Sequence, residues 1–415
     1  MVGLWLLVPE YLRLGVFDLL CGWTGRPAAE VEPRLALQLV GQSALCLPGL
    51  RAGRSLSQKG FEVANGLPFV ASDQAIHDLL DAHTLAEAER LQGALGRLRR
   101  ASGHFPGRLL AIDPHRTRSW SKRQMRLHRH KEGTAALKMA QTFFCLDTQT
   151  SQPLCFTSGT AARTVARATP GLLRLAADIL RPDPGQALVL ADGEHFTAEL
   201  LEGVRHDTPF DLLVPAPSQR ALQARLRAVP GEAFTRRWAG YATAQTPYQF
   251  KRGQGDPFRL FIQRSGETPD DYQFRGFLST TDRDPAEALT RDFPQRWHVE
   301  EFFNLDQDIG WARAGTQNLH IRYGQMSLAL IAQAAIHQLR QRLGPTAAAW
   351  NAKHLANTVF QGIEGDLRVC DDTLVVTFYN APEPDLLREH YEHLPEKLRA
   401  EQVDPRVPWL YGGCV

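Results

Sequence analysis

The stretch RLLAID, residues 108–113, decides the fold, because a short apolar run ends there in a single carboxylate. A second stretch of the same kind, ALVLAD at residues 187–192, also ends in an aspartate. Short apolar runs bounded by turn signals are typical of strands that are buried on both faces of a sheet. We therefore predict two buried strands, which end at Asp113 and Asp192.

Further strands and helices surround these two strands, and their order predicts an α/β fold with a mixed sheet and helices on its faces. A segment at about 220–282 has β character and reads as an insertion, and residues 1–104 have helix-like spacing. The other predicted strands lie at 141–147, 153–160, 211–217, 234–250, 258–266 and 273–281, with a final hairpin at 367–380. The predicted helices lie at 169–180, 195–204, 284–293, 295–304 and 326–343.

Composition indicates an ordinary folded protein. The chain has 415 residues, of which 43% are hydrophobic and 22% charged, and this leaves room for two or three domains of roughly 150 residues. The net charge is only +2, so an anionic partner would have to meet a local basic patch. The six cysteines are scattered without a CxxC pair, which argues against a zinc site and favours reduced thiols in the cytoplasm. The apolar residues 1–20 include Pro9, Glu10, Arg13 and Asp18, so we expect a buried helix and no membrane partner.

The segment QRWHVEEFF, residues 295–303, offers a third acid. On a helix, Glu300 would share a face with the apolar Phe303, whereas Glu301 would point about 100° away. We therefore predict that Glu300 faces inward, with Arg296 one turn before it. The simpler alternative is an i,i+4 ion pair between Arg296 and Glu300.

Three carboxylates that meet would suit phosphoryl transfer. Ligands of such sheets bind beyond the carboxyl ends of the strands, so Asp113 and Asp192 would meet if their strands are neighbours. The alternative is that each aspartate merely starts a turn, since Asp-Pro and Asp-Gly are common turn dipeptides. Two or three carboxylates can hold Mg²⁺, or Mn²⁺ in its place. Two such ions ~4 Å apart can activate an attacking hydroxyl and stabilise a leaving oxygen.

Two basic stretches could bring a polyanion to these acids. Residues 116–131 carry the densest positive charge in the chain, and we predict contacts with a DNA backbone rather than a solvated loop. In residues 234–252, arginines interleave with aromatic rings, so Trp238 could stack on an unpaired base. The alternative there is an edge strand with aromatic cross-strand pairs. The predicted DNA-contacting residues are Arg116, Arg118, Lys122, Arg123, Arg126, Arg236, Arg237, Trp238 and Arg296.

The motifs AIDPH, LADGEHF and FPQRWHVEEFF, in this order around the β-rich segment, resemble those of bacterial insertion-sequence transposases of the DDE type. More narrowly, they resemble the group whose third-acid helix bears a Tyr-x2-Arg-x3-Glu-x6-Lys signature. The resemblance implies a ribonuclease-H-like core with Asp113, Asp192 and Glu300 as the catalytic, metal-binding triad and Arg296 as the signature arginine. It also implies a Mg²⁺-dependent homodimer that cuts double-stranded DNA at terminal inverted repeats and joins the freed 3′ ends to a target.

Two signature positions differ from this pattern. The tyrosine falls on Phe293, which keeps the ring but loses the hydroxyl, and the lysine falls on Gln307, which loses a charge. Neither change touches an expected metal ligand, so cleavage should persist. Two alternatives stay open: a ribonuclease-H-like DNA nuclease without strand transfer, and a domesticated DNA-binding protein that no longer cuts.

The resemblance and the composition divide the chain into three predicted regions. Residues 1–104 form a helical region that could bind the DNA ends, although a plain bundle is favoured where Asp73, Asp78 and Asp81 would repel phosphates. Residues 105–345 form the catalytic domain with its insertion, and residues 346–415 form a hairpin and tail that could make dimer or DNA contacts. We expect the protein in the cytoplasm, associated with the nucleoid when it is bound to DNA.

Overall fold

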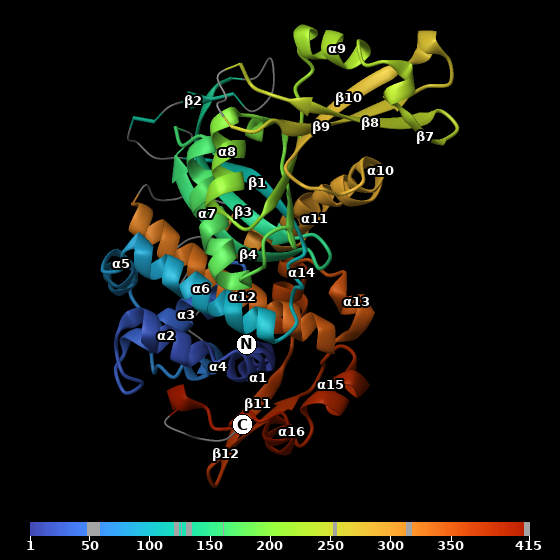
Figure 1. Ribbon diagram of the computed structural model, residues 1–415. Helices are drawn as coiled ribbons and strands as arrows, with labels where there is room; N and C mark the ends of the chain where they lie inside the picture. The colour runs from blue at the N-terminus through green and yellow to red at the C-terminus, as the bar shows by residue number, and fades with distance from the viewer. Residues whose placement is uncertain are drawn as a thin grey trace. The chain divides into compact units, whose positions relative to one another are not determined.

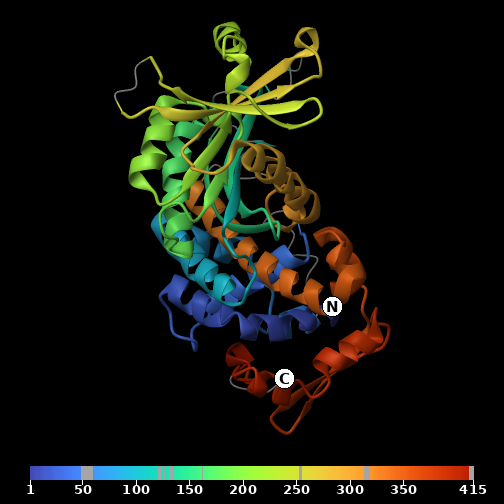
Figure 2. The ribbon, with the colours of Figure 1, turned by 45° about the vertical axis from the view of Figure 1, so that its right-hand side comes forward.

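The chain folds into two compact units. Figures 1 and 2 show the whole chain coloured by residue number, from the N-terminus in blue to the C-terminus in red. The sheet unit comprises Arg100–Arg116 and Gln141–Phe302, and the helical unit comprises Met1–Arg99, Thr117–Ala140 and Phe303–Val415. The computed structural model describes residues 1–47, 59–119, 124–125, 127–129, 135–160, 162–251, 255–312 and 318–410.

A mixed sheet forms the core of the sheet unit (Figure 1). Its central strands are β1 (Leu109–Arg118), β5 (Leu188–Leu190) and β6 (Asp211–Pro215), which are parallel neighbours. The strand order is β2-β3-β1-β5-β6-β10-β9-β8-β7, with β4 paired to β3. The remaining bounds on this side are β2 (Leu127–His128), β3 (Leu137–Asp147) and β4 (Gln152–Thr160). The predicted α/β fold with a mixed, helix-flanked sheet is confirmed.

The predicted β-rich insertion continues this sheet beyond β6. Its strands are antiparallel, and β10 pairs with β6, so one sheet serves both the core and the insertion. The strand β7 is the edge of that sheet. The bounds are β7 (Thr235–Trp238), β8 (Tyr241–Tyr248), β9 (Phe258–Ser265) and β10 (Gln273–Ser279).

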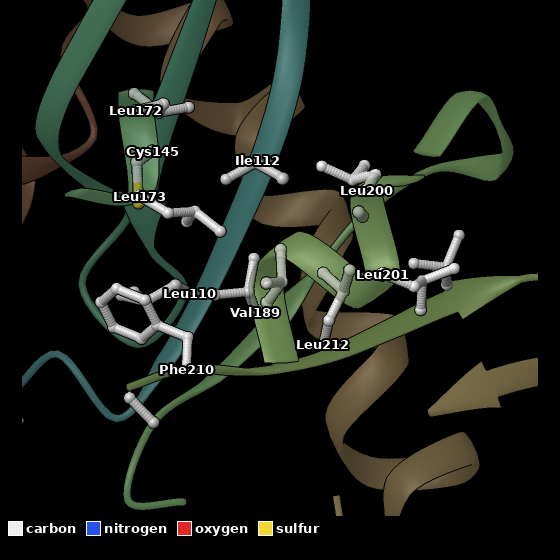
Figure 3. Close-up of a cluster of buried hydrophobic side chains, with 14 of the residues drawn as sticks. Leu110, Ile112, Cys145, Leu172, Leu173, Val189, Leu200, Leu201, Phe210 and Leu212 are labelled. Carbon is white, nitrogen blue, oxygen red and sulfur yellow. The ribbon is translucent and has the colours of Figure 1, made fainter. Parts of the chain in front are cut away.

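Helices cover both faces of the sheet. Alternating strand residues send Leu110, Ile112 and Val189 into one hydrophobic cluster and Leu188 and Leu190 into another on the opposite face. Figure 3 shows the first cluster, where side chains of α7 and α8 pack on those of β1, β5 and β6. The helices of this face are α7 (Val165–Leu180), α8 (Ala198–Asp207) and α9 (Arg220–Arg227). The other face is covered by α10 (Pro285–Glu287) and the helical turn η6 (Ala288–Asp292).

The strand β1 is longer than predicted. It does not end at Asp113 but continues through Pro114 to Arg118. Its neighbour β5 ends at Leu190, which lies opposite Ala111, so among the described residues the pairing with β5 does not extend to Asp113 and Pro114. An open edge is where a strand tolerates proline, which cannot donate a backbone hydrogen bond.

The helical unit is built around α12 (Leu319–Arg342), which packs against α3 (Glu32–Ala44) and α5 (Asp73–Asp81). The helical character predicted for residues 1–104 is confirmed, and α5 belongs to a bundle. By its contacts α12 groups with the N-terminal helices, whereas we predicted a catalytic domain that extends to residue 345. In the ranges that the structure describes, no helix is long and apolar enough to span a membrane.

The remaining elements complete both units. Those of the first hundred residues are η1 (Gly3–Leu7), α1 (Val8–Arg13), α2 (Val16–Thr24), α4 (Lys59–Ala64) and α6 (Leu85–Ala101). Short turns of the sheet unit are η3 (Gly193–His195), η4 (Gly231–Ala233), η5 (Pro269–Asp271) and η7 (Phe293–Trp297). The helix α11 (His298–Asp306) leads into η8 (Gln307–Ile309). The C-terminal elements are α13 (Gly344–Ala348), α14 (Ala352–Leu355), η9 (Ala356–Phe360), β11 (Gly365–Cys370), β12 (Thr373–Phe378), α15 (Pro384–Tyr391), α16 (Leu394–Ala400) and η10 (Pro408–Leu410).

Candidate active site

Asp113 and Asp192 lie level with each other on neighbouring parallel strands. The pairing of Ala111 with Leu190 fixes the register, and each aspartate lies two residues further along its own chain segment. Asp113 is within β1, and Asp192 lies two residues after the end of β5 and caps the turn η3. The two strands are therefore neighbours, which is the condition under which the two aspartates were expected to meet.

The surroundings of Asp113 oppose its ionisation. Burial raises the pKa of this carboxyl most, and the negative charge of Asp192 raises it further, from 3.8 to about 7. Arg296, His195 and Arg116 lower the pKa in part. Arg296 is the first of these, with Nη1 3.5 Å from Asp113 Oδ1. A carboxyl whose pKa is raised by a second carboxylate is typical of functional sites.

Asp192 is held in its ionised form by hydrogen bonds. Burial by itself would raise its pKa, but the hydrogen bond and charge of His195 and the backbone N–H of Glu194 bring the pKa below its ordinary value. His195 Nδ1 lies 2.6 Å from Asp192 Oδ1, and the Glu194 N–H donates to the same oxygen at 3.1 Å. His195 is 1% exposed, so water does not compete for this bond. The sequence-based prediction missed His195, although the Asp-x-x-His spacing directly after a strand could have indicated it.

Arg116 connects β1 to the turn after β5. Its Nη2 donates to Glu194 Oε2 at 2.5 Å, and its Nε donates to Gln141 Oε1 at 3.4 Å. We predicted that Arg116 contacts DNA, but its guanidinium is largely covered and already has a carboxylate partner. Since Glu194 and His195 are adjacent in η3, this one turn supports both acids.

Glu300 does not face inward as predicted. It is exposed in the first turn of α11, and so is Glu301, while Val299 and Phe302 are buried. The buried face of α11 is formed by Val299, Phe302, Phe303 and Asp306, and Glu300 lies outside it. Arg296 belongs to the differently wound turn η7, so its spacing to Glu300 is not that of one continuous helix. The two glutamates differ in their partners, because Glu301 Oε2 accepts from His298 Nδ1 at 2.7 Å.

The two departures from the signature have different surroundings. Phe293 packs edge-on against Phe277 of β10, with ring centroids 4.9 Å apart, and joins the hydrophobic cluster beneath η6. Its ring therefore has a structural role that does not need the missing hydroxyl. Gln307 starts η8 in the helical unit, where its carbonyl accepts from the backbone of Trp311.

The predicted DNA-binding residues of the insertion lie on two faces of the sheet. Arg236 is exposed and pairs with Ala242, on the face covered by α9. Arg237 Nη2 lies 2.7 Å from Asp284 Oδ2. Asp284 caps α10, which lies on the opposite face. Trp238 stacks on Tyr241 with ring centroids 4.3 Å apart, so the cross-strand pair is what the structure shows, although 51% of Trp238 stays exposed.

The other residues predicted to contact DNA are Arg118, at the end of β1, and three residues further along the chain. Arg118 is exposed at the end of the strand. Lys122, Arg123 and Arg126 lie outside the described residues. Their predicted contact with DNA stays a prediction.

The donor set of the site consists of carboxylate oxygens. Asp113 and Asp192 are the two predicted ligands that the structure brings together, and Glu300 is four residues beyond Arg296. Over the described parts of the chain, no three His, Cys, Asp or Glu side chains are grouped closely enough to hold a metal ion. The pair is thus the part of the predicted triad that the fold assembles.

No protein-family model matches the sequence, and no curated protein matches it either. Among solved structures, the chain is similar to one described as the cryo-EM structure of a piggyBac transposase synaptic complex with hairpin DNA. This similarity has a TM-score of 0.44 and 11% sequence identity, and it covers 86% of this chain and 79% of that chain. At this level of similarity, the function has to be argued from the site itself.

Proposed function

We propose that the protein is a DNA transposase that cuts at the terminal inverted repeats of an insertion sequence and transfers the 3′ ends to target DNA. The observation that carries the proposal is that Asp113 and Asp192 each lie two residues beyond the paired residues Ala111 and Leu190 of two parallel strands, close enough for their charges to interact, with Arg296 against Asp113. The resemblance of the sequence motifs supports the same function. The proposed partner is double-stranded DNA, at element ends and target, and the proposed active species is a cytoplasmic homodimer.

Carboxylate oxygens of this kind fit a hard divalent cation. The negative charge of Asp192 contributes to the raised pKa of Asp113, and a cation held by both would favour the ionised form of each. Glu300 is the proposed third ligand. When bound, Mg²⁺, or Mn²⁺ in its place, would supply activation of the attacking hydroxyl and stabilisation of the leaving oxygen.

The neighbouring side chains have supporting roles in this proposal. His195 keeps one oxygen of Asp192 in a fixed hydrogen bond, which leaves the other oxygen for a ligand. Arg116 holds the turn that carries His195 through its bond to Glu194. Arg296 is close enough to Asp113 to donate to a phosphate bound there, and its planar fork can make two such bonds.

The test uses the purified protein, Mg²⁺ and a linear duplex that carries the DNA bordering its own gene. We expect 3′-hydroxyl ends at the element boundary, joined products with a target plasmid, and no product when EDTA removes the metal. Asp113→Asn and Asp192→Asn should each lower cleavage by several orders of magnitude. DNA affinity should stay equal or rise slightly, because a negative charge that repels phosphates is removed.

Two other outcomes would replace the proposal. Cleavage that never yields a joined 3′ end would make the protein a DNA nuclease without strand transfer. DNA binding without any cleavage, unchanged in Asp192→Asn, would make it a DNA-binding protein that has lost its chemistry.

A further inference from the structure

We propose that Asp292 is a positioning residue, which fixes the segment that carries Arg296 and Glu300 against the acid pair. Asp292 is the last residue of η6, directly before η7, and it is 3% exposed. The inference rests on the proposed function for the role of that segment, but its geometry belongs to the sheet unit by itself.

The carboxylate of Asp292 is held by two arginines, one in the loop after β10 and the other directly before Asp292 in the chain. Arg283 Nη1 donates to Oδ2 at 2.7 Å, and Arg291 Nε donates to Oδ1 at 3.2 Å. Arg283 lies in the loop that follows β10, so its bond ties η6 to the end of a sheet strand. A buried carboxylate is tolerated only when it is paired in this way, which fixes both oxygens in direction as well as distance.

The contacts on either side of Asp292 are of a different kind. Ala288 and Leu289 pack in the hydrophobic cluster beneath η6, and Phe293 packs on Phe277. Apolar contacts are not directional, so they hold the segment on the sheet without setting its rotation. The two directional bonds of Asp292, from Arg283 and Arg291, set the rotation of the segment on the sheet.

The constraint matters because the next turn reaches the acids. Arg296 is four residues beyond Asp292 and approaches Asp113 to 3.5 Å, and Glu300 is four residues further. A rotation of η7 would move Arg296 and Glu300 together relative to Asp113. A displacement of about 1 Å at a reacting centre can cost on the order of 100-fold in rate.

The same segment offers a matched control at its other end. Asp284 caps α10 and accepts from Arg237 at 2.7 Å, as Asp292 accepts from Arg283. Its side chain is 46% exposed, however, and it precedes η6 rather than η7. Loss of this carboxylate should loosen the start of α10 and leave η7 in place.

The experiment compares Asp292→Asn, Arg283→Met, Arg283→Lys and the control Asp284→Asn by two readouts. Hydrogen exchange without metal or DNA should become faster for the amides of residues 293–302 in Asp292→Asn and Arg283→Met, with no change in β1 and β5. Single-turnover DNA cleavage should fall by about 10–100-fold in these two variants while the DNA Kd stays within about twofold. Arg283→Lys should recover most of the rate, and Asp284→Asn should keep it.

Unchanged exchange of residues 293–302 in Asp292→Asn would overturn the inference, as would an equal loss of cleavage in Asp284→Asn. The exchange readout also separates the two proposals. If the wild-type protein cuts no DNA, the proposed function fails, while the exchange of residues 293–302 still decides whether Asp292 positions the segment.

Discussion

At the residue scale, two identical side chains have opposite pKa shifts. The pKa of Asp113 is raised by burial and by Asp192, whereas that of Asp192 is lowered by its bonds to His195 and Glu194. Burial raises the pKa of both carboxyls, so the opposite shifts come from the hydrogen-bond donors, which only Asp192 has among the causes of its shift. The charged form of Asp113 is therefore disfavoured in the fold, and a carboxyl perturbed in this way is typical of a functional position.

The raised pKa of Asp113 predicts a pH dependence of stability in the metal-free protein. Between pH 4 and about 7, folded Asp113 keeps a proton that the unfolded chain has lost, so folding becomes less favourable as the pH rises through this window. The change amounts to on the order of 4 kcal/mol for three pKa units. Asp113→Asn removes this titration. In urea unfolding with EDTA, the free energy of unfolding of the variant should therefore rise relative to that of the wild type from pH 4.5 to pH 8. A difference between the two that does not vary with pH would contradict the raised pKa.

At the scale of elements, boundaries decide which side chains are presented. The strand β1 runs on past its acid although its neighbour β5 ends at Leu190, and α11 starts later than the pattern of its residues suggests. Likewise α7 begins at Val165, ahead of the predicted start at residue 169, with Pro170 inside the helix. The ends of elements are the least certain part of a prediction from local patterns.

Glu300 and Glu301 are both exposed in the first turn of α11. A pair of substitutions shows which of them is the third acid. Glu300→Gln should abolish cleavage if Glu300 is the third acid. Glu301→Gln should reduce it only a few-fold, because Glu301 bonds to His298 within the same turn. The measurement is single-turnover cleavage at several Mg²⁺ concentrations, where loss of a ligand should raise the Mg²⁺ requirement. An inactive Glu301→Gln beside an active Glu300→Gln would reverse the assignment.

At the scale of the whole molecule, charged groups lie inside the helical unit as well. Asp306 is 2% exposed and Arg340 5%, and their atoms Oδ1 and Nη1 are 2.8 Å apart. Gln333 donates to the second oxygen of Asp306 at 2.9 Å. Such a buried pair adds little net stability, but removal of one partner leaves the other charge uncompensated.

Asp306→Ala should therefore destabilise the protein by about 3–5 kcal/mol, because Arg340 would stay buried without its carboxylate. Asp385→Ala is the control, since Asp385 pairs with Arg388 at 3.1 Å on the surface, with 93% of its side chain exposed. That change should cost less than about 1 kcal/mol. Urea unfolding followed by circular dichroism measures both, and equal costs would show that burial of the pair does not matter.

The sequence by itself determined the class of fold and the residues that could do chemistry. Apolar runs that end in Asp113 and Asp192, the β-rich insertion and the helical N-terminal region all follow from local patterns, which depend on neighbours a few residues apart. Only the tertiary structure decided that β1 and β5 are adjacent and in register, and that His195 supports Asp192. It also decided that Arg116 binds Glu194 and that Glu300 is exposed. These features depend on contacts between distant segments and on where neighbouring elements end, which no local pattern encodes.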